Sequence, residues 1–256
     1  MTDTPSPSAA LIIIGSEVLS GKVRDANTPF MVDELRKLGV ALKRVVVIPD
    51  VIETIANEVR FASENFDWVF TTGGLGPTHD DLTMEAMAVA FDVKLVQSPE
   101  LVEALNQLKR NHPVDSLIRL TWIPKNAQLF WGDGERIWPT VHIGNVYIFP
   151  GVPEFLRHRF AAMRSLLQAT PFVCHNVYCS KNESELVSEI NTVVAAHPKV
   201  ELGSYPQFGN DDHRVRITFD AQDGESADAV LEHFLSLMTN DVVIRVMRDH
   251  GRDAPY

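Results

Sequence analysis

Apolar stretches alternate with amphipathic stretches along most of the chain. Residues 10–14 form a continuous apolar run, which is typical of a strand covered on both faces. Further strands are predicted at 45–48 and 67–71, and between these two the apolar residues from Ile52 to Phe66 keep the helical period. This alternation predicts an α/β fold, a three-layer α/β/α sandwich with a mostly parallel sheet.

Capping residues, together with proline and glycine, predict where the helices begin and end. A helix over 28–38 has Thr28 as its predicted cap, Pro29 at its first position and Gly39 just past its end. Asp50 is followed three residues later by Glu53, a capping-box pattern that predicts Asp50 as the cap of the next helix.

The middle of the chain is less regular. We expect a short strand at 93–96, a helix opened by Ser98 and Pro99, and a helix from the Pro-Gly-rich segment 150–153 to about Gln168. Strands at 138–142 and 146–149 flank a turn and predict a hairpin. Residues 112–136 give no clear prediction.

A second pattern follows Pro171. Strand and helix signals then occur in the order βαββαβ, which is ferredoxin-like. The predicted segments are 172–179, 183–196, 200–205, 213–219, 225–239 and 242–246. We therefore expect a disordered tail over 1–9, a main α/β domain over 10–170 and a small α+β domain over 171–250.

Charge and composition exclude several classes of protein. The chain has 23 Lys and Arg against 34 Asp and Glu, a net charge of −11, and no basic block, so a nucleic-acid partner is not expected. No apolar run is long enough for a transmembrane helix, and the first residues lack a signal segment, so neither membrane association nor export is expected. Cys174 and Cys179 lie five apart in a predicted strand, on opposite faces, which disfavours a disulfide and indicates a cytoplasmic protein.

The densest candidate site is TTGGLGPTHDDLT, residues 71–83, at the end of a predicted strand. Glycines permit close backbone approach, and exposed N–H groups can hold an anion. Asp80 and Asp81 precede a helix, so one of them could simply be its cap. A cap needs neither the second acid nor the glycines, and we therefore favour a ligand site. His79 is expected to be an exposed loop residue.

A second cluster follows the first strand and should reach the same crevice, because ligands bind at the carboxyl ends of parallel strands. Ser16, Glu17, Asp25 and Asn27 are each ordinary turn or cap residues in isolation. Together with the acids of the glycine-rich loop they suit Mg²⁺ or a similar hard cation. The glycine-rich loop would bind phosphates and the acids would bind a metal ion. Together they would stabilise the charge on a phosphoryl group.

The motifs GSEVLSGKVRDANTPFM, TTGGLGPTHDDLTMEA and FPGVPEF resemble the molybdopterin-binding (MoaB/Mog-like) superfamily. Within it, the resemblance is to the branch of the CinA amino-terminal domain and the molybdopterin-binding-like domain of FAD synthase. LGSYPQFGNDDHRVRITFD, residues 202–220, resembles the continuation of the FAD synthase domain. The resemblance covers nearly the whole chain.

The resemblance implies a pocket whose residues can be carried over one by one. Its ligand-binding residues would be Gly73, Gly74, Gly76, Pro77, Thr78, Thr83, Ser16, Asp25, Asn27, Pro150, Gly151 and Pro153. It also implies a divalent metal (Mg, Mn or Co), a nucleotide or pterin ligand, and a homo-oligomer, either dimer or trimer. Two departures bear on catalysis. Ser16 stands where the family usually has Asp, and Arg119-Leu120-Thr121 stands where it has Lys-Met-Ala.

The function expected from this combination is a metal-dependent nucleotide pyrophosphatase that hydrolyses FAD or ADP-ribose-type diphosphates. Asp80, Asp81 and Glu17 would be its catalytic residues and metal ligands. The alternative is a molybdopterin- or nucleotide-binding protein without catalytic activity. A purely structural protein would leave the acid-plus-glycine loop without a purpose.

Overall fold

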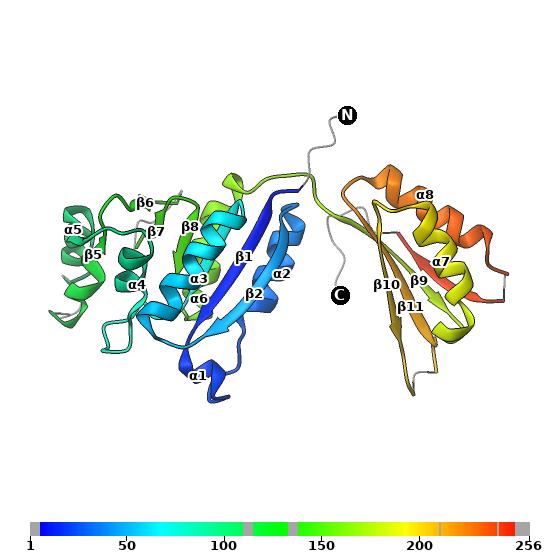
Figure 1. Ribbon diagram of the computed structural model, residues 1–256, viewed down its shortest axis with the longest axis horizontal. Coiled ribbons are helices and arrows are strands. Elements are labelled where there is room, and N and C mark those ends of the chain that lie inside the picture. Colours follow the sequence, from blue (N-terminus) through cyan, green and yellow to red (C-terminus); the bar gives the residue numbers. More distant parts are fainter. Residues whose placement is uncertain (1–5, 110–114, 133–137, 210, 240, 249–256) are drawn as a thin grey trace. The chain divides into compact units, whose positions relative to one another are not determined.

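The computed structural model describes residues 6–109, 115–132, 138–209, 211–239 and 241–248 (Figure 1). The chain divides into two compact units. The first comprises Met1–Leu35 and Val40–Gln168, and the second comprises Arg36–Gly39 and Ala169–Tyr256. The segment 1–9 was predicted as a disordered tail, but the first strand already begins at Ser8 within it. Residues 1–5 lie outside the described residues.

A six-stranded mixed sheet forms the centre of the first unit, in the order β2-β1-β3-β8-β7-β6. The pairs β1–β2, β1–β3 and β3–β8 are parallel, and β7 and β6 continue the sheet antiparallel. The strands are β1 (Ser8–Ile14), β2 (Ala41–Ile48), β3 (Trp68–Thr72), β6 (Gln128–Phe130), β7 (Thr140–Ile143) and β8 (Val146–Phe149). Helices cover both faces of this sheet, so the predicted three-layer, mostly parallel fold is confirmed.

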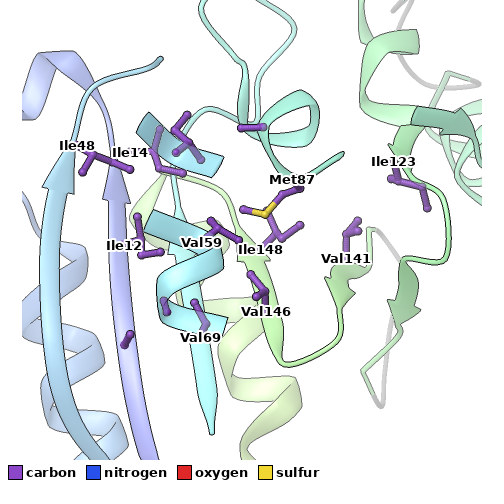
Figure 2. Close-up of a cluster of buried hydrophobic side chains, with 14 of the residues drawn as sticks. Ile12, Ile14, Ile48, Val59, Val69, Met87, Ile123, Val141, Val146 and Ile148 are labelled. Atoms are coloured by element: carbon purple, nitrogen blue, oxygen red, sulfur yellow. The ribbon is translucent and has the colours of Figure 1, made fainter. Parts of the chain in front are cut away.

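The apolar run of β1 is buried on both faces, as its lack of alternation predicts. Ile12 and Ile14 face a core that α3 (Ile52–Asn65) and α4 (Thr83–Ala90) complete. Figure 2 shows these two side chains in the same cluster as Val59 of α3 and Met87 of α4. The buried residues of α3 recur every three to four positions, and those of β1 that face them recur every two. Each period places its residues on one side of the helix or strand, so the two sets pack against each other.

The opposite face of the sheet is packed with aromatic rings. Phe160 of α6 (Pro153–Met163) lies edge-on to Phe70 of β3, with ring centroids 6.0 Å apart. The same ring contacts Phe149 of β8 and Phe30 of α2 (Asn27–Lys37). Phe160 is fully buried, so its truncation to alanine should cost about 3–5 kcal/mol.

The cap prediction for α2 is wrong. The helix begins at Asn27, and the Asp25 carboxylate accepts the N–H groups of Asn27 at 2.9 Å and Thr28 at 3.1 Å. The Thr28 hydroxyl is buried and has no hydrogen-bond partner among the described residues. A carboxylate is the stronger acceptor at the positive end of a helix, so Asp25 takes the role expected of Thr28.

The cap prediction for α3 is also wrong. Val51 precedes the helix, and no side chain caps its first N–H groups. The Asp50 carboxylate instead accepts the N–H of Ser16 at 2.7 Å. A partner 34 residues away along the chain therefore displaces the local cap that the sequence pattern predicts.

The segment between α4 and the hairpin forms a separate layer. The strand predicted at 93–96 lies at β4 (Leu95–Gln97), which pairs antiparallel with β5 (Trp122–Pro124) in a two-stranded sheet. The helix α5 (Pro99–Lys109) follows β4, and the 3-10 helix η1 (Asp115–Thr121) precedes β5. Parts of the region without a clear prediction, residues 112–114 and 133–136, lie outside the described residues.

The second unit has the predicted βαββαβ order and a four-stranded antiparallel sheet, β10-β11-β9-β12. Central strands 1 and 3 flanked by strands 2 and 4 make the ferredoxin-like arrangement. The elements are β9 (Val173–Cys179), η3 (Glu183–Glu185), α7 (Val187–Ala196), β10 (Glu201–Pro206), β11 (Val215–Ala221), α8 (Gly224–Ser236) and β12 (Val243–Met247). Its core joins Val177, Ile217 and Phe219 of the sheet to Phe234 of α8.

The two cysteines lie in β9, where both are buried and neither forms a disulfide. Burial raises the pKa of the Cys179 thiol to about 11. Across the described residues, no helix combines the length and the apolar character that crossing a membrane requires.

Candidate functional site

The order of the strands places the candidate site. The chain leaves β1 toward β2 on one side, whereas β3 lies on the other side of β1. This reversal is a topological switch point, where the loops at the carboxyl ends of neighbouring parallel strands diverge and leave a crevice. The loop after β1 and the glycine-rich loop after β3 therefore lie at the same edge of the sheet, as the sequence predicts.

The start of the glycine-rich loop needs glycine for steric reasons. Gly73 has φ of 108°, and a Cβ atom there would lie 1.9 Å from the carbonyl oxygen of Ile14. Gly74 has φ of 60°, and its Cβ would lie 2.4 Å from the hydroxyl of Thr83. Any other residue would both adopt a left-handed backbone and collide with these atoms. The two glycines let the chain turn directly over the end of β1.

The loop is held in shape by its own side chains. The Thr83 hydroxyl donates to the carbonyl oxygen of Gly73 at 2.8 Å, and the Thr83 N–H donates to that of Gly74 at 3.2 Å. The Asp81 carboxylate accepts the Thr78 N–H at 2.8 Å and also the Thr78 hydroxyl. Asp81 therefore has a structural role in the loop, but not the role of helix cap that the sequence left open for one acid, because no side chain caps α4.

The loop leaves backbone donors free for a ligand. In the described part of the chain, the N–H groups of Gly74, Leu75 and Gly76 have no hydrogen-bond acceptor. Successive unpaired N–H groups of this kind form an anion-binding concavity. This observation supports the predicted phosphate-binding role of the loop.

Asn27 joins three segments that the sequence placed in one pocket. Its side-chain amide donates to the Thr72 hydroxyl and to the carbonyl oxygen of Gly151, both at 2.9 Å. The Thr72 hydroxyl donates in turn to the carbonyl oxygen of Pro150 at 2.9 Å. Asn27, Pro150 and Gly151 therefore come together, but Asn27 serves as a buried connector beneath the loops.

The other predicted acids are more exposed. Glu17 lies in the short helix α1 (Ser16–Leu19), and its carboxylate folds back beside Gly15. The side chains of Asp80 and His79 are 64% and 98% exposed. The nearby Thr78 hydroxyl is the main cause that holds the pKa of the Asp80 carboxyl below its usual range, so Asp80 is ionised at neutral pH.

The predicted metal site is not supported by this geometry. Among the described residues, no group of three His, Cys, Asp or Glu side chains could hold a metal ion. The physical reason lies in the hydrogen bonds already made. Asp25 caps α2 and Asp81 closes the glycine-rich loop, so neither carboxylate is free to turn toward Glu17 and Asp80.

A cavity of about 580 Å³ opens beside the loop, a volume typical of small-molecule sites. Four of the predicted site residues, Gly74, Gly76, Asp81 and Pro150, contribute to its wall. The remaining lining residues come from the glycine-rich loop (Leu75), from the segment before β7 (Trp138), and from α4, α5, η1, α6 and the strands β4, β5, β7 and β8: Met84, Glu85, Leu95, Leu105, Leu117, Arg119, Leu120, Trp122, Val141, Ile148, Glu154, Phe155, His158 and Arg159. The other predicted residues shape the loops or lie outside this cavity, and Pro153 opens α6.

Arg119 links the cavity wall to the glycine-rich loop. Its guanidinium donates to Glu85 of α4 at 2.6 Å and to the carbonyl oxygen of Thr78. In the sequence, Arg119 was noted only because it stands where the family has the lysine of Lys-Met-Ala. Trp122, Trp138 and Arg159 were missed altogether. Trp122 lies in the region without a clear prediction, whereas Trp138 and Arg159 lie in a predicted strand and a predicted helix in which no motif marks them as cavity residues.

Comparisons with known proteins cover both parts of the chain. Residues 10–169 match the family described as probable molybdopterin binding domain, and residues 171–247 match the FAD synthase middle domain. A protein of Archaeoglobus fulgidus is 34% identical over 230 residues, which are 90% of this chain and 97% of that protein. A probable FAD synthase of Caenorhabditis briggsae is 33% identical over 92% of this chain and 50% of its own length. The chain thus spans about half of that FAD synthase.

One solved structure is similar in fold and in sequence. It is the crystal structure of CinA, a protein of unknown function from Thermoplasma acidophilum. It is 27% identical, with a TM-score of 0.56, and the match covers 64% of this chain and 99% of the CinA chain. The resemblance to the CinA and FAD synthase branch, stated from the motifs, is confirmed.

The names of the relatives contradict the expected activity. The nematode relatives are called FAD synthases, which form FAD, whereas the expected pyrophosphatase breaks it. The hydrolase hypothesis is therefore wrong, and a binding protein without catalytic activity is no better supported. The physical reason is that an anion-binding loop holds the phosphates of reactants and products alike, so it does not reveal the direction of the chemistry.

Proposed function

Because the chain belongs to the family of probable molybdopterin binding domains and its second unit matches the FAD synthase middle domain, we propose that it takes part in forming FAD from FMN and ATP. The ligands would be nucleotides bound at the glycine-rich loop and the cavity beside it. The reaction class is adenylyl transfer. The whole activity of the FAD synthases is a proposal for this chain, which spans about half of their length.

The reaction joins two phosphates. A phosphate oxygen of FMN forms a bond to the α-phosphorus of ATP, the bond from that phosphorus to the bridging oxygen of the β-phosphate breaks, and pyrophosphate leaves. Negative charge increases on the phosphoryl oxygens and on the leaving group during this step. The free N–H groups of Gly74, Leu75 and Gly76 would stabilise that charge because they are already oriented by the loop.

The acids of the loop would act mainly by positioning. Asp81 holds Thr78 and so fixes the curvature that presents the N–H groups. A divalent ion would enter as part of the substrate, bound to the phosphates of ATP, since the described residues supply no three-ligand site of their own. Asp80, exposed and ionised, would be able to contact such an ion through water.

The observation that carries the proposal is the combination of unpaired N–H groups with FAD synthase similarity across 92% of the chain. The test is to incubate the purified protein with FMN, ATP and Mg²⁺ and to resolve FAD and pyrophosphate by chromatography. We expect FAD to form in proportion to protein concentration. Absence of FAD at protein concentrations approaching those of the substrates would contradict the proposal.

A pair of variants tests whether the loop is responsible. Asp81→Ala removes both hydrogen bonds to Thr78, so FAD formation should fall at least tenfold, which corresponds to about 1.4 kcal/mol of barrier. Asp33→Ala removes an exposed carboxylate from α2 and should leave the rate unchanged. Equal rates for the two variants would show that the loop does not contribute to the proposed reaction.

We also expect a homo-oligomer, and light scattering after size-exclusion chromatography will measure its mass.

A further inference from the structure

The cavity beside the glycine-rich loop has a mostly apolar wall that includes two tryptophans. Trp122 follows η1 and Trp138 precedes β7, so the two rings approach the cavity from different segments. Neither ring stacks on another aromatic ring in the described part of the chain, and the Trp122 residue is 42% exposed. Unpaired indole faces in a concave site favour a planar aromatic ligand.

One cation of the same cavity has no partner. Arg159 lies on α6 and lines the cavity, yet among the described residues no acceptor forms a hydrogen bond or ion pair with its guanidinium. Burial lowers the pKa of Arg159 to about 10, so the group is still charged at neutral pH. Arg159 is half-buried, and an unpaired charge in a partly buried place gains more from an anion in the cavity than a fully exposed charge would.

The other arginines nearby are already engaged. Arg119, the second guanidinium of the cavity, bonds Glu85 and the Thr78 carbonyl oxygen. Arg157, two residues before Arg159 on α6, lies over the ring of Phe30 at 5.5 Å on another side of the helix. Of these three side chains, only Arg159 combines a place in the cavity with an unused charge.

We propose that Arg159 binds the phosphate of FMN while the flavin ring occupies the tryptophan-lined part of the cavity. FMN joins a planar tricyclic ring to a single phosphate, which matches an aromatic wall with one free cation. Gly74 and Gly76 line the same cavity, so Arg159 and the loop border one continuous space. This inference rests on the proposed function for the identity of the ligand.

The test compares two flavins that differ only in the phosphate. FMN and riboflavin are titrated with the ligand-free protein, and quenching of flavin fluorescence reports binding. The wild-type protein should bind FMN more tightly than riboflavin. Arg159→Gln should weaken FMN binding by about ten- to a hundredfold, the range for a hydrogen bond to a charged group, and should leave riboflavin binding unchanged.

Two further variants separate the parts of the site. Arg157→Gln, the matched control on the same helix, should change neither affinity. Trp122→Leu should weaken FMN and riboflavin by the same factor, because both flavins carry the ring. Arg159→Gln should not lower the melting temperature, since the guanidinium stabilises nothing in the ligand-free protein, whereas a structural arginine would lower it.

The outcomes are distinct. The inference is overturned if neither flavin binds, if riboflavin binds as tightly as FMN, or if Arg159→Gln weakens both flavins equally. FMN binding that depends on Arg159 without any FAD formation would support this site and remove the proposed reaction. FAD formation together with an FMN affinity that Arg159→Gln does not change would support the proposed reaction and overturn this site.

Discussion

The carboxylate of Asp50 accepts a hydrogen bond from the backbone N–H of Ser16 at 2.7 Å, and the Ser16 hydroxyl accepts the N–H of Asp50 at 3.3 Å. This reciprocal pair joins the loop after β1 to the end of β2, next to the switch point. The resemblance stated from the motifs implies an aspartate at the position of Ser16. In this chain the carboxylate of the pair comes from Asp50 instead.

The first prediction concerns that pair. Ser16→Asp should place a second carboxylate against Asp50, and the free energy of unfolding should fall by about 1 kcal/mol, an amount limited by exposure to solvent. Ser16→Ala should cost less, because it loses only the long hydrogen bond from the Asp50 N–H. Urea unfolding at low and high salt measures both.

A rescue experiment separates charge repulsion from other causes. Adding Asp50→Asn to Ser16→Asp should restore most of the lost stability, since the amide oxygen still accepts the Ser16 N–H. A Ser16→Asp penalty that persists in high salt and in the double variant would show that repulsion is not its origin.

The second prediction concerns Gly73. Gly73→Ala should destabilise the first unit by about 3 kcal/mol or more, because the new Cβ would meet the Ile14 carbonyl oxygen at 1.9 Å in addition to the backbone strain. Gly21→Ala is the matched control. Gly21 has φ of 72° but open space around it, so only the strain of about 1 kcal/mol applies. Similar costs for the two variants, measured by chemical denaturation, would contradict the close approach over β1.

The third prediction concerns Asn27. In Asn27→Asp, an oxygen replaces the amide donor that serves Thr72 and Gly151, so acceptors face one another in a buried site. The free energy of unfolding should fall by roughly 3 kcal/mol. Asn65→Asp, at an exposed hydrogen bond near the end of α3, should change stability by less than about 1 kcal/mol. A mild effect at Asn27 would mean that the three segments are not held through its amide.

The fourth prediction concerns pH. Asp67 accepts the N–H and the hydroxyl of Ser8, both at 2.7 Å, and these bonds, the hydroxyl first, hold the pKa of Asp67 below its ordinary 3.8. Since the folded-state pKa is the lower one, the stabilisation is fully present above about pH 4 and is lost as the pH falls through the folded-state pKa. At pH 7, Asp67→Asn should cost less than about 1 kcal/mol, because the carboxylate is exposed.

The measurement is the difference in unfolding free energy between wild type and Asp67→Asn at pH 7, 5 and 3. The difference should be the same at pH 7 and 5 and should shrink at pH 3. A difference that grows toward acid pH would show that the sign is wrong and that Ser8 does not stabilise the ionised form.

The sequence by itself determined the layers of the first unit and the order of elements in the second. The apolar run of β1 and the helical period of α3 are local patterns, and nothing elsewhere in the chain opposes them. The glycine-rich loop could also be recognised, because the positive φ values of Gly73 and Gly74 belong to the turn itself. The close approach of Gly73 to the carbonyl oxygen of Ile14 could not be read from the sequence.

The tertiary structure decided what depends on partners distant in sequence. Asp50 does not cap α3, because its carboxylate accepts a backbone N–H 34 residues away. The side-chain amide of Asn27 donates to Thr72 of β3 and to Gly151 after β8. The cavity wall is assembled from η1, the hairpin and α6, so no window of sequence contains it. Arg159 looks like an ordinary helical arginine in the sequence, and only packing places it in the cavity wall without an acceptor among the described residues. Turns and helix periods depend on neighbouring residues and can be read from the sequence. Burial of a side chain and contacts between distant segments arise only when the chain folds.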